Sequence, residues 1–462
     1  MKPKSFPKGG MMSDINRRDF LKSSASVAAG VSILGTPAIA RGRTDPNDRI
    51  RVAIIGLRRR GRALIRSFHE LAKENVEIVA MCDVDESVLG ERKADYEKMS
   101  GKKVKTFTDM RAVLDEKSIH AVGFATPNHW HALGTIWACQ AGKDVYVEKP
   151  GSHNVFEGRK VVEAARKYKR IVQHGTQNRS SPNIVEGIEK LKEGVIGKVY
   201  MARGIAYKFR PSIGWIQPEP VPATLDWNAW QGPAPYNPYS RVRHRHWHLL
   251  WDYGNGDIGN QGVHELDIMR WGLGLDTHPT KIASMGGVYI HDDDQDTPKM
   301  QTVSYEYEGR DVLLTFEVRG WHTNPEAGMG TTYPFLDKRN VVGVIFFGTE
   351  GYMIIPDYTS YYTFLGRERT PGPKQEGMGD IANVSHFANF IKAVRSRKES
   401  DLTAGPRELH LSSALPHLAN IAYRTGRMLE FDPQNERLID DEEANELLTR
   451  DYRAPFLVPE NV

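Results

Sequence analysis

Cysteine, an excess of charge of one sign, and long apolar runs are all scarce in this sequence of 462 residues. The two cysteines, Cys82 and Cys139, could form one disulfide at most, so we expect two partly buried thiols rather than a cross-linked fold. The net charge is only +4, with 62 basic and 58 acidic side chains interspersed, which excludes the concentrated basic face that nucleic-acid binding needs. Beyond residue 40 no apolar stretch reaches membrane length, so we expect a mature protein that does not enter a membrane.

Residues 1–40 predict a twin-arginine signal peptide. A twin-arginine block, Arg17-Arg18-Asp19-Phe20-Leu21-Lys22, precedes a run of small and apolar residues that ends in Ala38-Ile39-Ala40. This ending has the small-x-small form of a cleavage site. We therefore expect export of a folded protein to the periplasm or another extracytoplasmic space. A retained N-terminal anchor is the alternative.

Residues 48–175 alternate short β-branched runs with amphipathic stretches. Such alternation predicts crossover units and a doubly wound parallel sheet with helices on both faces. The expected strands are 51–55, 76–82, 121–125, 145–147 and 171–173, and the expected helices are 61–72, 131–141 and 155–168.

The pattern changes near residue 175, and residues 176–435 predict a second, α+β domain with a mostly antiparallel sheet. Its expected strands are 199–206, 283–290, 301–307, 312–319 and 342–347, separated by long loops rich in Trp, Pro, Gly and His. Helical periodicity is found at 183–193, 262–272, 385–397 and 412–429. Residues 436–462 form a polar C-terminal extension that we expect to lie on the surface.

The first strand leads through Gly56-Leu57-Arg58-Arg59-Arg60-Gly61 into a helix, which is where a dinucleotide fingerprint belongs. Arg58 replaces a glycine that normally lets the backbone approach the pyrophosphate. We expect Gly56, Arg58, Arg60 and Gly61 to line the cofactor, although a plain strand–helix turn with solvated arginines has the same pattern.

Asp83 strengthens the dinucleotide prediction. It follows the second strand, where a carboxylate can hold the ribose hydroxyls and would repel a 2′-phosphate. NAD is therefore expected rather than NADP, while the arginines at 58–62 keep NADP as the less favoured option.

Two further motifs follow strands of the same sheet, at the carboxyl edge where ligands bind. They are Thr126-Pro127-Asn128-His129-Trp130-His131 and Glu148-Lys149-Pro150. A lysine beside the nicotinamide could hydrogen-bond a substrate hydroxyl and favour its deprotonation, whereas a surface lysine in a turn is the bland alternative. The residues expected to contact the cofactor here are Thr126, Pro127, Asn128, His131, Glu148 and Lys149.

In this order and spacing the motifs resemble the Gfo/Idh/MocA family, which includes glucose–fructose oxidoreductase and inositol dehydrogenase. The resemblance runs from about residue 48 to at least 430, and the stretches Glu-Lys-Pro-Gly-Ser-His-Asn and Gln-His-Gly-Thr-Gln are similar to its exported bacterial branch. It implies a Rossmann domain, an open-faced antiparallel sheet, and a homodimer or homotetramer formed through that sheet. It also implies hydride exchange between NAD(P) and a sugar or polyol.

The segment Gly259 to Asp267 resembles the family segment in which an acid and a histidine four residues apart face the substrate. His264 falls on the histidine and is the expected general base. Asn260 stands where the family usually has aspartate, and an amide can orient a hydroxyl but cannot take a proton. We expect Lys149, His264 and Asn260 to form the catalytic group, with Asp267 contacting the substrate.

Residues 241–252 contain His244, His246 and His248 in alternation. On an extended segment these would share one face and could bind a metal. A substrate-lining loop with Trp247 and Trp251 stacked on a sugar is favoured instead, so we expect no metal. Gln177 and Arg179 are further candidate substrate ligands, although Arg179 could also cap a helix.

These observations favour an NAD-dependent oxidoreductase that acts on a CH–OH group of a sugar, glycoside or polyol with tightly bound cofactor. The first alternative is a glycoside lyase or hydrolase working by transient oxidation and elimination, although the Tyr-Pro-Thr-His run of the family's glycosidases is absent. The second is a non-catalytic sugar-binding protein. Arg58 and Asn260 suggest it, but Asp83, Lys149 and His264 together oppose it.

Replacing both Arg17 and Arg18 with lysine should trap the uncleaved precursor in the cytoplasm, because the export route reads the arginine pair. Immunoblots of cytoplasmic and periplasmic fractions measure this. Mature protein outside the cytoplasm would show that another route carries the chain.

Overall fold

The computed structural model describes residues 48–326, 340–377 and 381–462. The predicted signal peptide lies outside these ranges. None of the helices within them is long and apolar enough to span a membrane. Cys82 and Cys139 are both buried and free, as expected.

The first sheet consists of six parallel strands in the order β3-β2-β1-β4-β5-β6. Its central strands are buried runs of apolar, largely β-branched residues, as strands covered on both faces must be. The strand order reverses between β1 and β4, which opens a crevice at their carboxyl ends. The strands are β1 Ile50–Ile55, β2 Val76–Cys82, β3 Lys105–Phe107, β4 Ala121–Phe124, β5 Asp144–Val147 and β6 Val172–His174.

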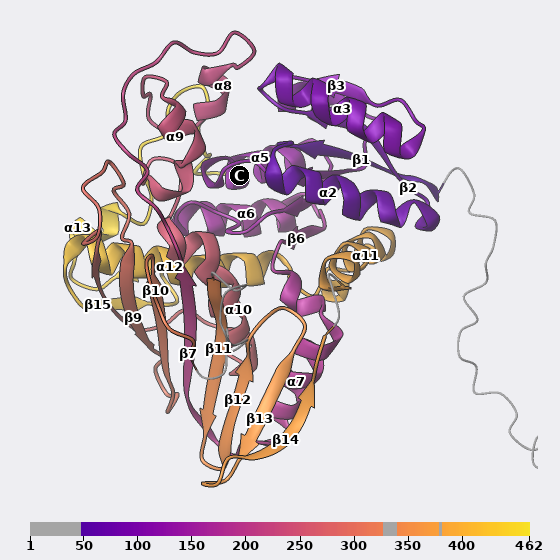
Figure 1. The fold of residues 1–462 in the computed structure, drawn as a ribbon. Coiled ribbons are helices and arrows are strands. Elements are labelled where there is room, and N and C mark those ends of the chain that lie inside the picture. Colours follow the sequence, from indigo (N-terminus) through magenta and orange to yellow (C-terminus); the bar gives the residue numbers. More distant parts are fainter. Residues whose placement is uncertain (1–47, 327–339, 378–380) are drawn as a thin grey trace, which may run out of the picture. The chain divides into compact units, whose positions relative to one another are not determined.

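Helices cover both faces of this sheet (Figure 1). One face packs against α4 Met110–Asp115, α5 Asn128–Gln140 and α6 Val155–Lys167. The other packs against α2 Arg59–Glu70, α3 Glu86–Ser100 and α11 Ile381–Ser396. The doubly wound parallel sheet is thus confirmed.

The second sheet has ten strands in the order β14-β13-β12-β11-β7-β10-β9-β8-β15-β16. Only β7 and β10 pair in parallel, so the prediction of a mostly antiparallel sheet is confirmed. The strands are β7 Val199–Lys208, β8 Lys281–Gly287, β9 Met300–Glu306, β10 Leu313–Arg319, β11 Asn340–Gly348, β12 Gly351–Ile355, β13 Tyr361–Leu365, β14 Thr370–Gln375, β15 Leu429–Asp432 and β16 Arg437–Leu438.

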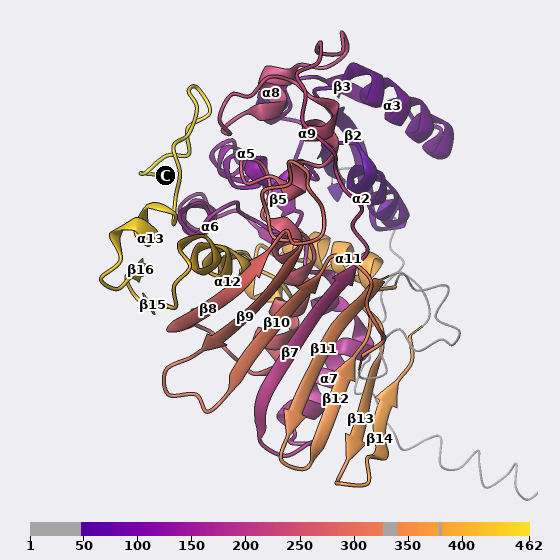
Figure 2. The same cartoon turned by 60° about the vertical axis from the view of Figure 1, so that its left-hand side comes forward.

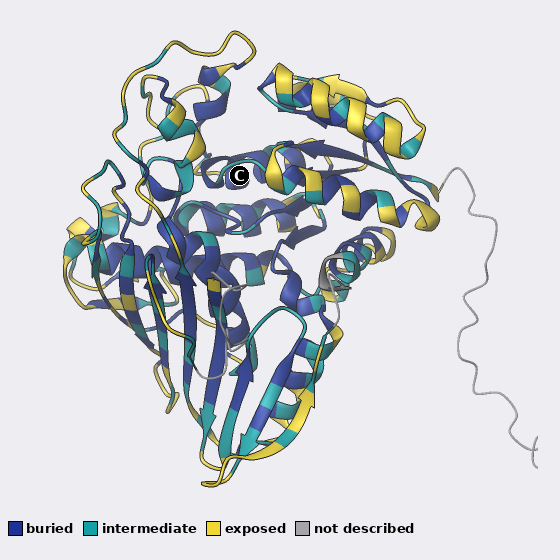
Figure 3. Cartoon of the chain, viewed as in Figure 1, coloured by how far each residue is buried: buried dark blue, intermediate teal, exposed yellow. Residues whose placement is uncertain are grey.

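One face of the second sheet packs against α7 Pro182–Lys192, α10 Val263–Gly272 and α12 Pro406–Thr425. Figure 2 shows no helix over the opposite face in the part drawn as ribbon. Along β8 the residues alternate accordingly: Ile282 and Ser284 are buried, whereas Met285 is 80% exposed. Figure 3 shows the same alternation over several strands of this sheet.

Several elements differ from the predicted ones. The short strand β3 and the helices α3 and α4 lack a clear apolar period and were not predicted, and neither were β12 to β16. Helix α12 ends at Thr425 rather than 429, because Gly426 adopts a left-handed conformation (φ 65°) that terminates the helix. The short helices α8 Trp227–Gln231, α9 Arg241–Arg245 and α13 Glu442–Glu446 complete the set.

The C-terminal extension packs against both layers. Leu438, Ala444 and Leu448 lie in the core of the second sheet, whereas Phe456 and Val458 lie in the core of the first. The Phe456 ring lies 5.4 Å from that of Trp130 and 6.5 Å from that of Trp137, both on α5. Arg453 donates to the carbonyl oxygen and the side chain of Asn228. The extension therefore joins α5 to the loop that carries α8.

The turn between β1 and α2 depends on two glycines. Gly56 has φ 82°, and a Cβ there would lie 2.7 Å from the backbone of Ala125. A Cβ on Gly61 would lie 2.0 Å from the carbonyl oxygen of Gly56. The turn thus folds back on itself with no room for a side chain, which leaves the amino end of α2 open toward the crevice.

A buried ion pair joins the two layers. Arg179 follows β6 in the turn Gln177–Ser180, and its Nε and Nη2 donate to both carboxylate oxygens of Asp267 on α10 at 2.8–3.0 Å. Ser412 of α12 donates to Asp267 at 2.6 Å. Burial would raise the pKa of Asp267, but Arg179, Arg270 and Ser412 outweigh it, so this pKa is lowered and the carboxylate is charged.

Gly61→Ala should destabilise the protein by about 1–3 kcal/mol or more, because the added methyl group would overlap the Gly56 carbonyl. Gly90→Ala is the matched control. Gly90 lies in α3 with open space around it, and alanine there should stabilise by about 0.5–1 kcal/mol. Chemical denaturation measures both, and equal effects would contradict the close approach at Gly61.

Asp267→Asn should lower the free energy of unfolding by about 3–5 kcal/mol, because it leaves the buried Arg179 charge without its partner. Asp311→Asn breaks the exposed pair with Lys198 and should leave the melting temperature unchanged. A small effect of Asp267→Asn would show that this ion pair does not anchor α10.

Candidate active site

Asp83 lies at the end of β2, beside the glycine turn. Its Oδ2 accepts the Leu57 amide at 2.7 Å and its Oδ1 accepts the Asp85 amide at 3.0 Å. Burial raises its pKa, while these two amides and Arg58 oppose the rise. Each oxygen retains acceptor capacity, so the carboxylate can still receive ribose hydroxyls.

Arg58 is already neutralised by a carboxylate. Its Nη2 lies 2.6 Å from Oδ2 of Asp85, and Asp85 also caps α3 and accepts the Thr224 hydroxyl. One of the arginines predicted to attract a 2′-phosphate is thus paired with a carboxylate beside β2.

Glu148 is the centre of a buried hydrogen-bond network. Its Oε1 accepts Arg60 Nε at 2.7 Å, the Gln177 amide at 3.3 Å and the Tyr146 hydroxyl at 3.4 Å. We predicted direct contacts to the cofactor for Arg60 and Glu148 and to the substrate for Gln177. In the structure both Arg60 and Gln177 donate hydrogen bonds to Glu148. They tie α2 to the strand end that carries Lys149.

The Thr126–His131 segment forms the start of α5. The His131 ring nitrogens contact the carbonyl oxygens of Pro150, at 2.6 Å, and Thr126, at 2.8 Å, so this side chain joins the two predicted motifs instead of facing the crevice. Asn128 likewise donates to Asn255 at 3.0 Å. The buried hydroxyl of Thr126 has no hydrogen-bond partner within residues 48–326, 340–377 and 381–462.

The crevice residues fit a dinucleotide. The glycine turn leaves a cradle that a Cβ would fill, the first amides of α2 can receive an anion, and the Thr126 hydroxyl and the Asp83 carboxylate offer polar groups beside it. The prediction of NAD therefore agrees with the chemistry of the residues at this edge.

Lys149 reaches the second layer from the end of β5. Its Nζ donates to the carbonyl oxygen of Asn260, which lies in a single π-helical turn, Ile258–Gly262, directly before α10. Such turns are common at functional sites. Burial lowers the pKa of Lys149 to about 8; Glu148 and Glu265 oppose this shift, and Lys208 and Arg60 add to it.

His264 occupies the first turn of α10 and is 5% exposed. Its Nδ1 is buried and has no hydrogen-bond partner among the residues that the structure describes, and its ring lies 5.3 Å from that of Tyr358. Burial lowers its pKa well below the usual value, and Lys149, Arg60 and Lys208 lower it further. A neutral imidazole of this kind can accept a proton, and its coupling to Lys149 brings two predicted catalytic residues together.

Four residues beside this pair were not predicted: Lys208, Gln261, Glu265 and Tyr358. The Gln261 amide donates to Glu265 Oε1 at 2.7 Å and to the Tyr358 hydroxyl at 3.1 Å, and its oxygen accepts Lys208 Nζ. Glu265 follows His264 directly in sequence, which was the one available signal. Lys208 and Tyr358 come from β7 and from the loop after β12, and no local pattern indicated their approach.

The structure engages the predicted substrate ligands in contacts within the protein. Asp267 is 0% exposed and is bonded to Arg179, so both contribute to the contact between the layers. The Trp251 ring lies 5.4 Å from Arg424 and 6.5 Å from the Tyr423 ring, at the end of α12. Trp247 is half-buried beside the aromatic cluster of the α8 loop.

The alternating histidines do not share a face, because residues 241–245 form helix α9 and not an extended segment. His244 packs among Trp227, Trp230 and Tyr239. The metal-site alternative assumed an extended segment with three histidines on one face, and this assumption is therefore wrong.

A different histidine–carboxylate cluster lies at α12. His278 and His410 both direct Nε2 to Oε1 of Glu436, at 3.5 and 2.9 Å, and Arg159 donates to Oε2 of Glu436 at 2.9 Å. In the described part of the chain, Nδ1 of each histidine is buried without a hydrogen-bond partner, whereas a metal-bound histidine normally donates its second ring N–H to such a partner. The contacts therefore describe two imidazoles that donate to one carboxylate.

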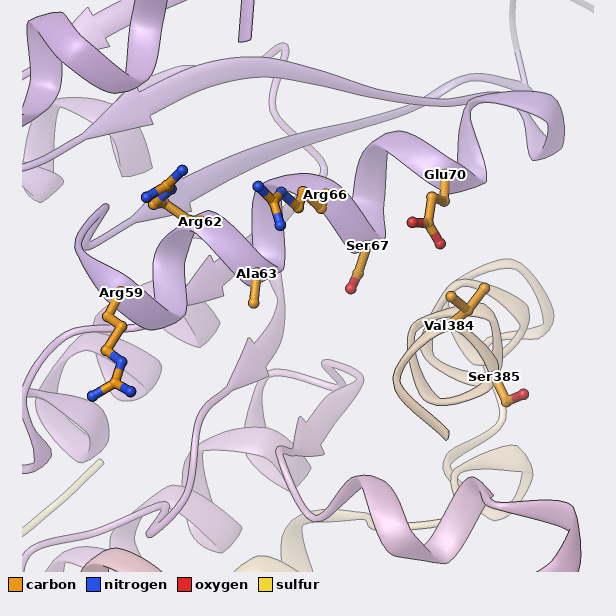
Figure 4. Close-up of a pocket in the computed structure, with 8 residues that line it drawn as sticks. All are labelled: Arg59, Arg62, Ala63, Arg66, Ser67, Glu70, Val384 and Ser385. Atoms are coloured by element: carbon orange, nitrogen blue, oxygen red, sulfur yellow. The ribbon is translucent and has the colours of Figure 1, made fainter. Parts of the chain in front are cut away.

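A hollow lies between α2 and α11 (Figure 4). It is lined by Arg59, Arg62, Ala63, Arg66, Ser67, Glu70, Val384 and Ser385, so neither Lys149 nor His264 belongs to its lining.

Comparison with known families agrees with this arrangement. The model of an oxidoreductase family with an NAD-binding Rossmann fold matches residues 50–176, and the model of its C-terminal alpha/beta domain matches 186–327 and 376–458. A twin-arginine signal-sequence model matches 14–33, so the chain carries an export signal of that route.

Among curated relatives, a glycosyl hydrolase family 109 protein of Stenotrophomonas maltophilia is 38% identical over 141 residues, which is 29% of each chain. A levoglucosan dehydrogenase of Pseudarthrobacter phenanthrenivorans is 30% identical over 169 residues, 36% of each chain. The chain thus spans less than half the length of these relatives.

The fold is shared with the WlbA dehydrogenase of Bordetella pertussis, solved with NADH and UDP-GlcNAcA. The TM-score is 0.61 at 17% identity, over 83% of this chain and 99% of that one. The two family models together cover both layers of the fold, and the chain belongs to the Gfo/Idh/MocA family of NAD-binding oxidoreductases.

Proposed function

We propose that the protein oxidises a hydroxyl group of a sugar, glycoside or polyol, using NAD held in the crevice of the first sheet. The observation that carries this proposal is the burial of Lys149 and His264 together at the carboxyl edge of that sheet, both with lowered pKa. The lowering brings the pKa of Lys149 close to neutral pH, where an acid–base group is most effective, and it keeps His264 neutral, so that a ring nitrogen is available as an acceptor.

The proposed chemistry assigns a task to each side chain. Bound NAD supplies a hydride acceptor. The glycine turn and the amides of α2 hold the pyrophosphate, and Asp83 holds a ribose. The Lys149 ammonium donates to the substrate oxygen, neutral His264 takes the hydroxyl proton, and the Asn260 amide orients the substrate.

NAD is favoured over NADP for two reasons. The carboxylate of Asp83 would repel a 2′-phosphate, and Arg58, one of the arginines that could attract one, is paired with Asp85. The twin-arginine route supports a periplasmic location, where free NAD is scarce, and we infer that the cofactor is bound tightly before export.

A homodimer or homotetramer is proposed through the open face of the second sheet. Met285 and Leu313 are exposed on it, beside the polar and charged side chains of Arg203, Glu317 and Arg319, which pair with one another. This mixture of apolar and paired polar groups is typical of subunit contacts.

A lyase or hydrolase outcome is the second candidate. It is favoured by the similarity to a glycosyl hydrolase family 109 protein and by Asn260, an amide that cannot take a proton, where the family usually has aspartate. In that case, the oxidised sugar would undergo elimination and then be reduced again.

Lys149→Ala and His264→Ala should each lower turnover by about a hundredfold or more, since each removes a positioned acid–base group. The double variant should lose far less than the product of the two, because residues that act as a unit are non-additive. Lys198→Ala, on the surface, is the control. Steady-state turnover on a verified sugar measures this.

Asn260→Asp separates the two candidate outcomes. A rise in simple dehydrogenase turnover would indicate that the native amide is tuned for another overall reaction. If neither alanine variant changes turnover, the active-site assignment is wrong.

A further inference from the structure

Two lysines are held by consecutive residues of the π-turn. Lys149 donates to the backbone carbonyl of Asn260, and Lys208, from the end of β7, donates to the side chain of Gln261. One ammonium is delivered by the first sheet and the other by the second. Like charges this close, and shielded from water, disfavour each other's protonated form.

Glu265 supplies the opposing charge at the same place. It is 1% exposed, its Oε1 accepts the Gln261 amide at 2.7 Å, and its Oε2 is buried with no hydrogen-bond partner in the described ranges. Burying a carboxylate with one unpaired oxygen costs free energy, and contacts with neutral groups do not recover that cost. Attraction to the two ammonium groups offsets that cost.

The other charged groups near Lys149 are already engaged. Glu148 is tied to Arg60, and Asp257 is tied to Arg210 at 2.5–2.8 Å. The titratable groups that influence Lys149 or are influenced by it are Arg60, His131, Glu148, Lys208, His248, His264 and Glu265. Lys208 and Glu265 thus remain as the pair without a salt-bridge partner of their own in the described part of the site.

We propose that Lys208 and Glu265 are positioning residues that set the protonation of Lys149. Lys208 drives a proton off the neighbouring amine, and Glu265 holds one on it. The proposal rests on the role given to Lys149 above, and it accounts for the site's lack of the aspartate at 260: the regulating carboxylate lies at 265.

The pKa directions agree with this placement. Lys208 contributes to lowering the pKa of Lys149, and Glu265 contributes to raising it. Burial raises the pKa of Glu265 itself to about 7, which Gln261, Lys208 and Lys149 oppose. Both Lys149 and Glu265 therefore change charge close to neutral pH.

Two isosteric variants should move the titration of Lys149 in opposite directions. Lys208→Met removes a cation, so the pKa of Lys149 should rise, whereas Glu265→Gln removes an anion, so it should fall. Each shift should be about one pH unit, the size expected for a unit charge ~10 Å away at an effective dielectric constant of about 20. Lys208→Arg keeps the charge and should restore the native profile, and Lys198→Met is the surface control.

Two readouts measure these shifts across pH. The first is the rate at which acetic anhydride acetylates Lys149, followed by peptide mass spectrometry, which reports the neutral amine and needs no substrate. The second is the pH profile of kcat on a verified sugar. Circular dichroism confirms that each variant is folded.

If the two variants shift the pH dependence of Lys149 acetylation in opposite directions, the proposal is supported. This holds even if no sugar is turned over, a result that would contradict only the proposed function. Normal turnover with no shift in acetylation, or with shifts in the same direction for both variants, would overturn the proposal while leaving the proposed function in place.

Discussion

The buried ion pair between Arg179 and Asp267 fixes the position of α10 against the carboxyl end of the first sheet. Arg179 belongs to the turn that follows β6, and Asp267 lies three residues after His264 on α10. Because both charges are out of water, neither can shift without losing its partner. The position of His264, on α10, relative to Lys149, on the first sheet, therefore depends on the bond between Arg179 and Asp267.

An excess of cations characterises the pocket that this anchor creates. Lys149, Lys208 and Arg60 all lower the pKa of His264, so the imidazole is neutral and keeps a ring nitrogen available as an acceptor. The same surroundings keep Lys149 near the point of losing one. Among the described residues of this group, Glu265 is a carboxylate with one unpaired oxygen. It lies one turn after Asn260, where the family usually has aspartate, and supplies the negative charge that the amide at 260 lacks.

The sequence predicted what depends on local patterns. Apolar runs predicted most strands of the first sheet. The glycine turn and Asp83 indicated where the crevice lies, and Lys149 lies close enough to His264 to lower its pKa. The sequence could not predict contacts made by long-range packing. Arg179 and Asp267 looked like ligands because nothing local showed that they face each other, and Lys208 and Tyr358 come from distant elements of the second sheet. Strand β14 was missed because its two prolines, Pro371 and Pro373, are tolerated only at a sheet edge.

The most direct test of the account is to denature the folded, exported protein and identify the dinucleotide that it releases by mass spectrometry. The account predicts NAD⁺ or NADH in an amount approaching one per chain, because Asp83 and the glycine turn form a site that is filled before export. Release of NADP(H), or of no dinucleotide from a folded protein that also fails to bind added NAD, would contradict it.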